Sequence, residues 1–290
     1  MNKKIDFVIL HYNVQRETVK CVEHIKKSID TDNYRIIIVD NASPNQSGKM
    51  LKEHFLMDEK VQVLLLQENI GFARGNNVGI RYALKYDKPD YVCVMNNDVY
   101  LLDDELVEKL EREYQQSKFS VLGPYIKNPT GRKQSNPVSD VPIEKKEAYL
   151  FRIEYELGVL FKNTKIVEFA NKYLFGKYHP DRKCLDRERK YYNVKLHGCF
   201  LVFSKKYFER FRGFDSRTFM YHEEEILYRH LLENKMISVY EPDIKVYHRE
   251  GIATKNNFKD QKKKDIFRMK NYVHSLGVLI KVLQSYQKKK

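Results

Sequence analysis

The sequence predicts an α/β fold with a mostly parallel central sheet flanked by helices. Short apolar runs alternate with helical patterns through the first half of the chain, and four of these runs are followed by Asn or Asp. Such alternation is typical of a parallel sheet with right-handed crossovers. Polar residues at the carboxyl ends of parallel strands line the crevice in which open α/β sheets bind ligands. We therefore expect a ligand pocket at that edge.

The first half of the chain is expected to supply the parallel strands and their crossover helices. Periodicity alone cannot distinguish short apolar runs from helix segments, but the polar residues that follow them favour strands. The expected strands are Ile5–His11, Tyr34–Asp40, Val61–Leu66, Tyr91–Met95 and Val121–Pro124. The expected helices are Val14–Ile29, one opening at Pro44, Gly71 to about Tyr86, and Asp103–Gln116.

The second half of the chain has a less regular pattern. Asn128–Pro142 is expected as a loop and Glu147–Tyr178 as helical. The elements expected after them are a strand at Lys195–Phe203, a short helix at Lys205–Phe211, a turn at Gly213–Asp215, a helix within Phe219–Leu232, and strands at Ile237–Tyr240 and Ile244–His248. We expect one domain over residues 1–254, with a variable, partly helical insertion at 126–195. Residues 255–290 are expected to form a basic helical tail.

Composition excludes some classes of protein and leaves others open. The 290 residues are 42% hydrophobic and 32% charged, which indicates a globular chain. No apolar run approaches the ~20 residues of a membrane span, and we expect a cytoplasmic protein. Its four cysteines form no Cys-x-x-Cys pair, which argues against structural zinc. A net charge of +14 implies an anionic partner: nucleic acid, a phosphorylated small molecule or an anionic membrane leaflet.

The helical stretch Glu147–Tyr178 interleaves aromatic residues with Lys and Arg, and two interpretations remain open. Basic and aromatic side chains favour lipid headgroups, so the stretch can be a peripheral membrane surface. Alternatively, the aromatic residues form a local core with solvated lysines outside.

Carboxylates occur at two places where chemistry is expected. Asp98 ends the run Asn96-Asn97-Asp98 after the fourth strand, and it is the hard oxygen ligand that Mg²⁺ or Mn²⁺ takes. The alternative is a turn at a strand end, which Asn and Asp also favour. Glu223, Glu224 and Glu225 open a helix, where the helix dipole by itself favours acidic residues.

Five motifs in order carry a resemblance to a known family. They are Val8-Ile-Leu-His-Tyr-Asn13, Val39-Asp-Asn-Ala-Ser43, Asn69-Ile-Gly-Phe-Ala-Arg-Gly-Asn-Asn77, Asn96-Asn-Asp98, and Gly213-Phe-Asp215 with Phe219-Met-Tyr-His-Glu-Glu-Glu225. Together they resemble family 2 glycosyltransferases of the GT-A fold, and among these the bacterial rhamnosyltransferase-like enzymes of cell-surface polysaccharide synthesis. The resemblance covers Ile5 to about Thr254 and is weakest at 126–195.

The resemblance implies a role for each matched residue. The residues that it implies bind the nucleotide or lie beside it are Tyr12, Asn13, Asp40, Asn41, Asn69, Gly71, Arg74, Asn77 and Asn97. Asp98 matches the last residue of the D-x-D metal motif, and His248 matches a histidine that completes the metal site in some relatives. Glu224 matches the catalytic base, with Glu223 in reserve. Two positions depart from the pattern: Asn96 replaces the first carboxylate of D-x-D, and His222 replaces a smaller residue.

The activity that the resemblance implies is inverting sugar transfer. The donor would be dTDP-rhamnose or a UDP-sugar, assisted by Mg²⁺ or Mn²⁺. The acceptor would be a hydroxyl of a glycan or of a polyprenyl-diphosphate-linked oligosaccharide. A metal ion neutralises the leaving phosphates as a Lewis acid. A general base removes the acceptor proton and typically contributes ~10²–10⁴-fold.

Three alternative functions differ in how well they fit the sequence. A sugar-1-phosphate nucleotidyltransferase would need a Gly-rich phosphate loop after the first strand, and His11–Arg16 contains no glycine. Asn96 leaves open a decayed module that binds nucleotide-sugar or glycan without turnover. No nucleic-acid-binding motif is present, so nucleic acid is not expected as a partner. His11 and His197 are expected to be structural or acceptor-site residues.

Overall fold

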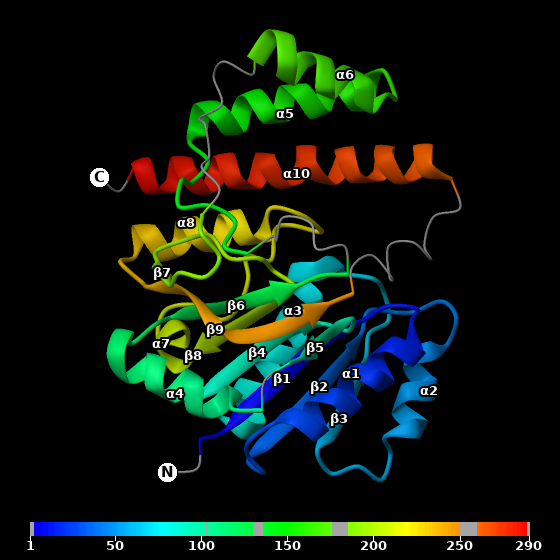
Figure 1. Ribbon diagram of the computed structural model, residues 1–290. Coiled ribbons are helices and arrows are strands. Elements are labelled where there is room, and N and C mark those ends of the chain that lie inside the picture. The colour runs from blue at the N-terminus through cyan, green and yellow to red at the C-terminus, as the bar shows by residue number, and fades with distance from the viewer. Residues whose placement is uncertain (1–2, 103, 130–135, 176–184, 250–259, 289–290) are drawn as a thin grey trace.

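A central twisted sheet with helices on both faces forms the body of the protein (Figure 1). The computed structural model describes residues 3–102, 104–129, 136–175, 185–249 and 260–288, and structural statements refer to these residues. The strands pair in the order β3-β2-β1-β4-β8-β6-β9-β5, with β7 on β9. This mixed α/β architecture confirms the predicted fold class.

The first half of the sheet is parallel, as predicted. It consists of β1 (Ile5–His11), β2 (Tyr34–Asp40), β3 (Val61–Leu65) and β4 (Tyr91–Asn96). The crossovers are α1 (Gln15–Ser28), α2 (Ser47–His54), and α3 (Gly71–Tyr82) extended by a π-helical turn, η1 (Ala83–Asp87). The register pairs His11 with Asp40 and Leu10 with Asn96, so the polar residues that follow these strands lie at one edge.

The second half of the sheet adds antiparallel pairs. β8 (Phe200–Ser204) runs antiparallel to both β4 and β6 (Val121–Lys127). β9 (Ser238–His248) is one strand where two were expected; its register against β6 shifts around Pro242, which has no N–H to donate. β5 (Val99–Leu101), which pairs with β9, and β7 (Tyr191–Tyr192) were not predicted. Both are too short to give a periodic signal.

Two further predictions differ from the structure. Residues 195–199 were expected to be part of a strand, but apart from a single β-bridge between Lys195 and Ser139 they form a loop that leads into β8. The predicted helix at 147–178 is instead α5 (Lys145–Leu160), α6 (Thr164–Phe169) and the π-helical turn η2 (Ala170–Phe175). Asn163 separates the two α-helices and caps the second, since its Oδ1 accepts from the backbone N–H of Lys165 at 3.0 Å. Residues 176–178 lie outside the described ranges.

Three apolar clusters hold the helices in place. On one face of the sheet α1, α2 and α4 (Leu106–Ser117) pack against β1, β2 and β4. On the other face lie α3, α7 (Lys205–Phe208) and α8 (Glu223–Glu233). The third cluster joins α5 and α8 to α10 (Gln261–Gln287) through buried residues such as Ile226, Leu276 and Leu279. In Figure 1, α10 lies between α8 and the α5–α6 pair.

The basic C-terminal helix is therefore packed into the structure along much of its length. Met269, Leu276, Leu279 and Leu283 of α10 are buried, and burial of such a side chain stabilises the fold by about 1.5–3 kcal/mol. None of the helices in the described part of the chain combines the length and apolar character that crossing a bilayer requires.

Candidate functional site

The site begins at the edge where β1, β2 and β4 end. Asp40 is buried there, and its Oδ1 accepts from the backbone N–H of Ser43 at 3.2 Å. Burial raises the pKa of Asp40, and the hydrogen bonds from Ser43 partly offset this shift. A Cβ at Gly48 would lie 2.1 Å from Asp40 Oδ2, so α2 reaches Asp40 only because residue 48 is glycine.

A buried chain of hydrogen bonds supports the loop that follows β4. His11 Nε2 lies 2.8 Å from Ser47 Oγ, and His11 Nδ1 lies 2.7 Å from Thr18 Oγ1. Asn97 Nδ2 donates to the same Thr18 oxygen at 2.9 Å. Burial lowers the pKa of His11 to about 4, so the ring is neutral at neutral pH. His11, expected to be a structural or an acceptor-site residue, is buried here, and its hydrogen bonds help to fix Asn97.

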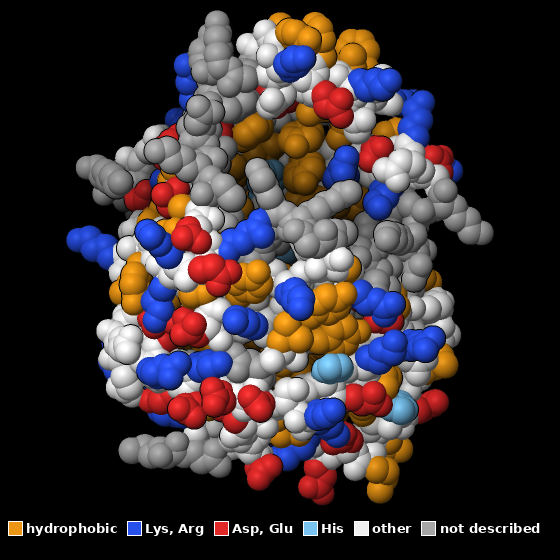
Figure 2. Space-filling view, viewed as in Figure 1, with side chains coloured by type: hydrophobic (Ala, Val, Ile, Leu, Met, Phe, Trp, Pro, Cys, Tyr) orange, Lys and Arg blue, Asp and Glu red, His pale blue; other side chains and the backbone are white. Residues whose placement is uncertain are grey.

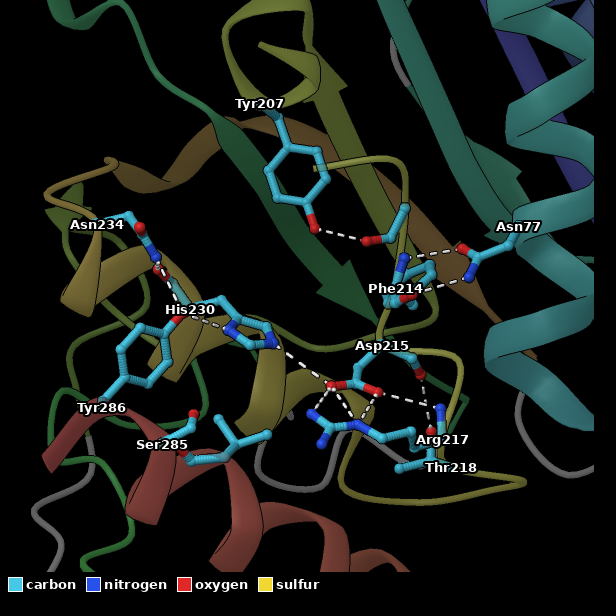
Figure 3. Close-up of polar contacts among 12 residues, drawn as sticks. Asn77, Tyr207, Phe214, Asp215, Arg217, Thr218, His230, Asn234, Ser285 and Tyr286 are labelled. Atoms are coloured by element: carbon cyan, nitrogen blue, oxygen red, sulfur yellow. Dashed lines mark hydrogen bonds and ion pairs between the residues drawn. The ribbon is translucent and has the colours of Figure 1, made fainter. Parts of the chain in front are cut away.

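The residues predicted beside the nucleotide fall into two groups. The amides of Asn41 and Asn77 are used on the protein's own backbone. Asn41 bonds Ile70 N and Gly71 O at 3.0 and 3.2 Å, and Asn77 bonds both backbone groups of Phe214 at 2.8 Å (Figure 3). These two residues position loops. Of the others, Tyr12, Asn13 and Asp40 lie at the β1–β2 edge and Asn97 follows β4, whereas Asn69 precedes α3 and Gly71 and Arg74 belong to its first turn. Tyr12 and Asn13 are half-buried, and Asn69 and Arg74 are exposed.

Gly71 is required by the way this loop meets the rest of the site. Its φ is +84°, in the left-handed region that favours glycine. A Cβ there would lie 2.2 Å from the backbone oxygen of Phe219, which accepts from Phe72 N at 2.7 Å. The loop predicted to lie beside the nucleotide therefore contacts the segment that precedes α8.

Asp98 and His248, the two residues predicted to bind metal, lie together. Pairing of β5 with β9 sets Val99 opposite His248, and His248 Nε2 lies 3.2 Å from Asp98 Oδ1. Two adjacent octahedral ligands, each ~2.1 Å from an ion, are about 3 Å apart, so this pair could share one ion. The described residues contain no group of three or more His, Cys, Asp or Glu arranged for a metal. Phosphate and water oxygens would have to complete the coordination.

A cavity of about 420 Å³ opens beside the predicted catalytic carboxylates. Its size falls in the range of small-molecule sites. The polar residues lining it include Asn96, Lys195, His197, Glu223 and Glu224. The apolar and aromatic residues lining it are Phe72, Val138, Cys199, Met220, Tyr221 and Tyr272. The contribution of Tyr272, from the predicted tail, was not foreseen, since helical periodicity does not show which helix reaches a cavity.

The three adjacent glutamates have different environments. Glu225 is buried and paired with Lys195 Nζ at 2.5 Å, and it accepts from Ile143 N at 2.7 Å, which is a structural role. Glu223 is also buried, and this burial, with the charge of Glu224, raises its pKa to about 8. Glu224 is half-buried and accepts from Gly198 N at 3.2 Å. A carboxyl that is protonated at neutral pH cannot accept a proton, so Glu224 is better suited as a base than Glu223.

The turn at Gly213–Asp215 connects the site to α8 and α10. Asp215 lies between Arg217, whose Nε is 2.9 Å from Oδ1, and His230, whose Nε2 is 3.5 Å from Oδ2 (Figure 3). Burial alone would raise the pKa of Asp215, but hydrogen bonds from Arg217 and His230 hold it well below its usual range. His230 Nδ1 is in turn 2.7 Å from the hydroxyl of Tyr286 on α10.

Known proteins share both this fold and parts of the sequence. The chain is 30% identical over 122 residues to "Glycosyltransferase GlyG" of Streptococcus pneumoniae serotype 4, covering 42% of this chain and 38% of that protein. It is 27% identical over 199 residues to "Low-salt glycan biosynthesis hexosyltransferase Agl10" of Haloferax volcanii, covering 68% and 53%. It is 27% identical over 124 residues to "dTDP-rhamnosyl transferase RfbF" of Shigella flexneri, covering 43% and 39%. These matches span about half or less of the relatives' lengths.

Among solved structures, S. aureus TarS residues 1–349 superposes with a TM-score of 0.52 at 14% identity. That match covers 92% of this chain and 70% of the TarS chain, and it supports the GT-A fold alone. The model of the family described as "Glycosyl transferase family 2" matches residues 6–211, which is more than half of the chain. The chain therefore belongs to glycosyl transferase family 2.

Proposed function

We propose that this protein transfers a sugar, with inversion, from a nucleoside-diphosphate donor to a hydroxyl group of a glycan acceptor. The observation that carries the proposal is the position of Glu224, a half-buried carboxylate on the wall of a cavity of about 420 Å³. Asn96, at the end of β4, lines the same cavity and is two residues from Asp98. The cavity is thus close to the edge where the donor diphosphate would bind.

In this proposal Asp98 and His248 would hold a Mg²⁺ or Mn²⁺ ion beside the donor. The ion would neutralise charge on the leaving phosphates. The distance of 3.2 Å between Asp98 Oδ1 and His248 Nε2 supports this assignment. Asn96 adds no charge where the family pattern has a carboxylate, so metal affinity should be modest. The donor phosphates would then contribute much of the coordination.

Glu224 acts as the general base. The acceptor oxygen attacks the anomeric carbon while the bond from that carbon to the diphosphate breaks. The bonding electrons leave with the phosphate, and the acceptor proton passes to a Glu224 oxygen. Direct displacement with one base inverts the anomeric centre. The hydrogen bond from Gly198 N to Glu224 Oε1 supports this role, since it orients the carboxylate in the cavity wall.

The donor is proposed to be dTDP-rhamnose or a UDP-sugar, in keeping with the similarity to a protein named as a dTDP-rhamnosyl transferase. The acceptor is proposed to be a glycan or a polyprenyl-diphosphate-linked oligosaccharide in cell-surface polysaccharide synthesis. Catalysis would take place at the cytoplasmic face of the membrane.

An exposed surface on α5, α6 and η2 supports membrane contact. Its large apolar members are Tyr149, Ile153, Leu160, Phe161, Phe169, Tyr173 and Leu174. Exposed Lys146, Lys162, Lys165 and Lys172 accompany them. Figure 2 shows hydrophobic side chains at the end of the molecule that α5 and α6 form. Aromatic and basic side chains together favour anionic lipid headgroups. Phe161→Ser with Phe169→Ser should reduce binding to anionic vesicles, and unchanged binding would exclude this surface.

The function is tested by donor binding and turnover across dTDP-rhamnose, UDP-galactose, UDP-glucose, UDP-GlcNAc and GDP-mannose. Each donor is assayed with Mn²⁺, Mg²⁺ or EDTA. We expect one donor to be used, with metal-dependent binding that Asp98→Ala abolishes. Binding of a donor without transfer to any acceptor would instead support a decayed binding module. Asn96 is the basis of that alternative hypothesis, because it replaces a carboxylate of the metal motif. Absence of binding for every donor would refute the proposal.

A further inference from the structure

Residues 213–222 carry the chain from the Gly213–Asp215 turn into Glu223 and Glu224. At the end of this segment Tyr221 and His222 have φ values of +71° and +62°. Two successive left-handed residues that are not glycine are strained, and such strain persists only where surrounding contacts hold it. The direction of the first turn of α8, and with it the position of both carboxylates, depends on this pair.

On the side of the sheet, α3 holds the segment. Asn77 bonds both backbone groups of Phe214 at 2.8 Å, as Figure 3 shows. The backbone N–H of Phe72 donates to Phe219 O at 2.7 Å. These contacts fix residues 214 and 219, but they lie before the strained pair.

On the opposite side, α10 holds the remainder of the segment. His274 Nε2 donates to Arg217 O at 3.0 Å, and Ser275 Oγ donates to Met220 O at 2.9 Å. The Tyr272 ring lies on the Tyr221 ring with centroids 4.7 Å apart and meets the His222 ring at 5.2 Å. These three residues of α10 therefore contact the segment from Arg217 through the strained pair.

The Tyr272 ring is itself fixed by α5. Its centroid is 4.7 Å from that of Tyr155, at an interplanar angle of 27°, so Tyr272 is stacked on Tyr155 and also contacts Tyr221, whose ring is tilted by 34° to it. Stacked aromatic rings have a preferred geometry. A rigid ring at this position restrains Tyr221 more closely than a mobile aliphatic side chain would.

We propose that α10 positions the catalytic carboxylates, with Tyr272 and Ser275 acting as positioning residues that hold the strained Tyr221–His222 pair. Both residues lie beyond 6–211, the part of the chain that matches the family model. The proposal rests on the proposed function only for its kinetic readout. Losing these contacts lets the pair relax and moves Glu224, and a displacement of about 1 Å can cost ~10²-fold in rate.

Two serines of α10 provide a matched test. Ser275 Oγ donates across to Met220 O, whereas exposed Ser285 Oγ donates to Val282 O of its own helix. Ser275→Ala and Ser285→Ala make the same chemical change in the same helix. Tyr272→Ala removes the ring, and Tyr272→Phe keeps it while removing the hydroxyl. For all four variants, hydrogen exchange of the peptide covering 217–224 is measured by mass spectrometry. For the two serine variants, kcat and donor KM are measured as well.

We expect faster exchange at 217–224 in Ser275→Ala and Tyr272→Ala than in Ser285→Ala and Tyr272→Phe. In Ser275→Ala kcat should fall about 10- to 100-fold with donor KM within twofold of wild type. The two Tyr272 variants are compared by hydrogen exchange alone, because Tyr272 itself lines the cavity. If Tyr272→Ala does not fold, the comparison of Ser275→Ala with Ser285→Ala decides whether α10 restrains the segment.

Exchange at 217–224 that is the same in both serine variants would overturn the proposal, as would an unchanged kcat in Ser275→Ala. A wild type that turns over no donor would refute the proposed function, while the exchange comparison would still decide whether α10 restrains the segment.

Discussion

Gly198→Ala is predicted to displace Glu224, the proposed catalytic base, without changing its chemistry. The backbone N–H of Gly198 donates to Glu224 Oε1 at 3.2 Å, and an added Cβ would lie 2.5 Å from that oxygen and 3.1 Å from Cγ and Cδ. Ordinary contact begins near 3.4 Å, so the carboxylate must move by about 0.9 Å. The φ of Gly198 is outside the left-handed region, so alanine adds no backbone strain there.

The size of the expected loss in kcat follows from this displacement. A misplacement of about 1 Å costs up to ~10²-fold in rate, which is about 2.7 kcal/mol of transition-state stabilisation. Stability should change little, because the displaced atoms are at the end of a flexible side chain. We therefore expect kcat to fall about 10- to 100-fold while the donor Kd stays within twofold.

The assay is steady-state sugar transfer combined with donor titration calorimetry. Gly277→Ala is the matched control, because a Cβ there would lie 3.4 Å from Arg152 Nη1, an ordinary contact, and alanine favours the helix. A Gly198→Ala enzyme with wild-type kcat would refute the assignment of Glu224 as a precisely placed base.

Further predictions concern stability and the metal. Asp6→Asn should flatten the pH dependence of stability. Burial, and then the charge of Asp87, raises the pKa of Asp6 from 3.8 to about 8 in the folded protein. Folding stability should therefore fall as the pH rises from about 4 to 8, by at most on the order of 5 kcal/mol, and the variant should lack this loss. Urea unfolding at pH 5, 7 and 8.5 measures the free energy of unfolding, and an equal change of this free energy with pH in the variant would contradict the prediction. Asn77→Ala should destabilise by about 1–3 kcal/mol, since it leaves two buried backbone groups of Phe214 without their partner; an unchanged urea midpoint would count against this. Asp98→Ala should remove the response of donor binding to Mn²⁺, and calorimetry that still shows that response would exclude Asp98 as a ligand.

Several parts of the fold could be predicted because their signal is local. The ranges of β1 and β2 were predicted to the residue, since each is an apolar run that ends at a polar stop. The predictions at 195–199 and 237–248 went wrong where distant partners decide the structure. Gly198 N donates to Glu224 rather than to a sheet ladder, and Pro242 forms a bulge within a single strand instead of ending it.

In the candidate site, too, local motifs could be predicted, and features that depend on distant contacts could not. The motifs identified Asp98 and His248, which lie together, but they left the choice between Glu223 and Glu224 open. Burial distinguishes these two adjacent residues, and burial depends on how α8 packs. Tyr272 could not be predicted at all, because its contacts with Tyr155 and Tyr221 join three elements far apart in the sequence.

The measurement that tests the central claim most directly compares two isosteric changes at adjacent residues, Glu223→Gln and Glu224→Gln. Glu223 is protonated at neutral pH in this account, because its pKa is about 8, so an amide there should keep kcat within about fivefold at pH 7. Glu224→Gln should bind the donor normally and lose ~10²–10⁴-fold in kcat, the usual contribution of a general base. The reverse pattern, a large loss in Glu223→Gln and near-normal turnover in Glu224→Gln, would contradict the account.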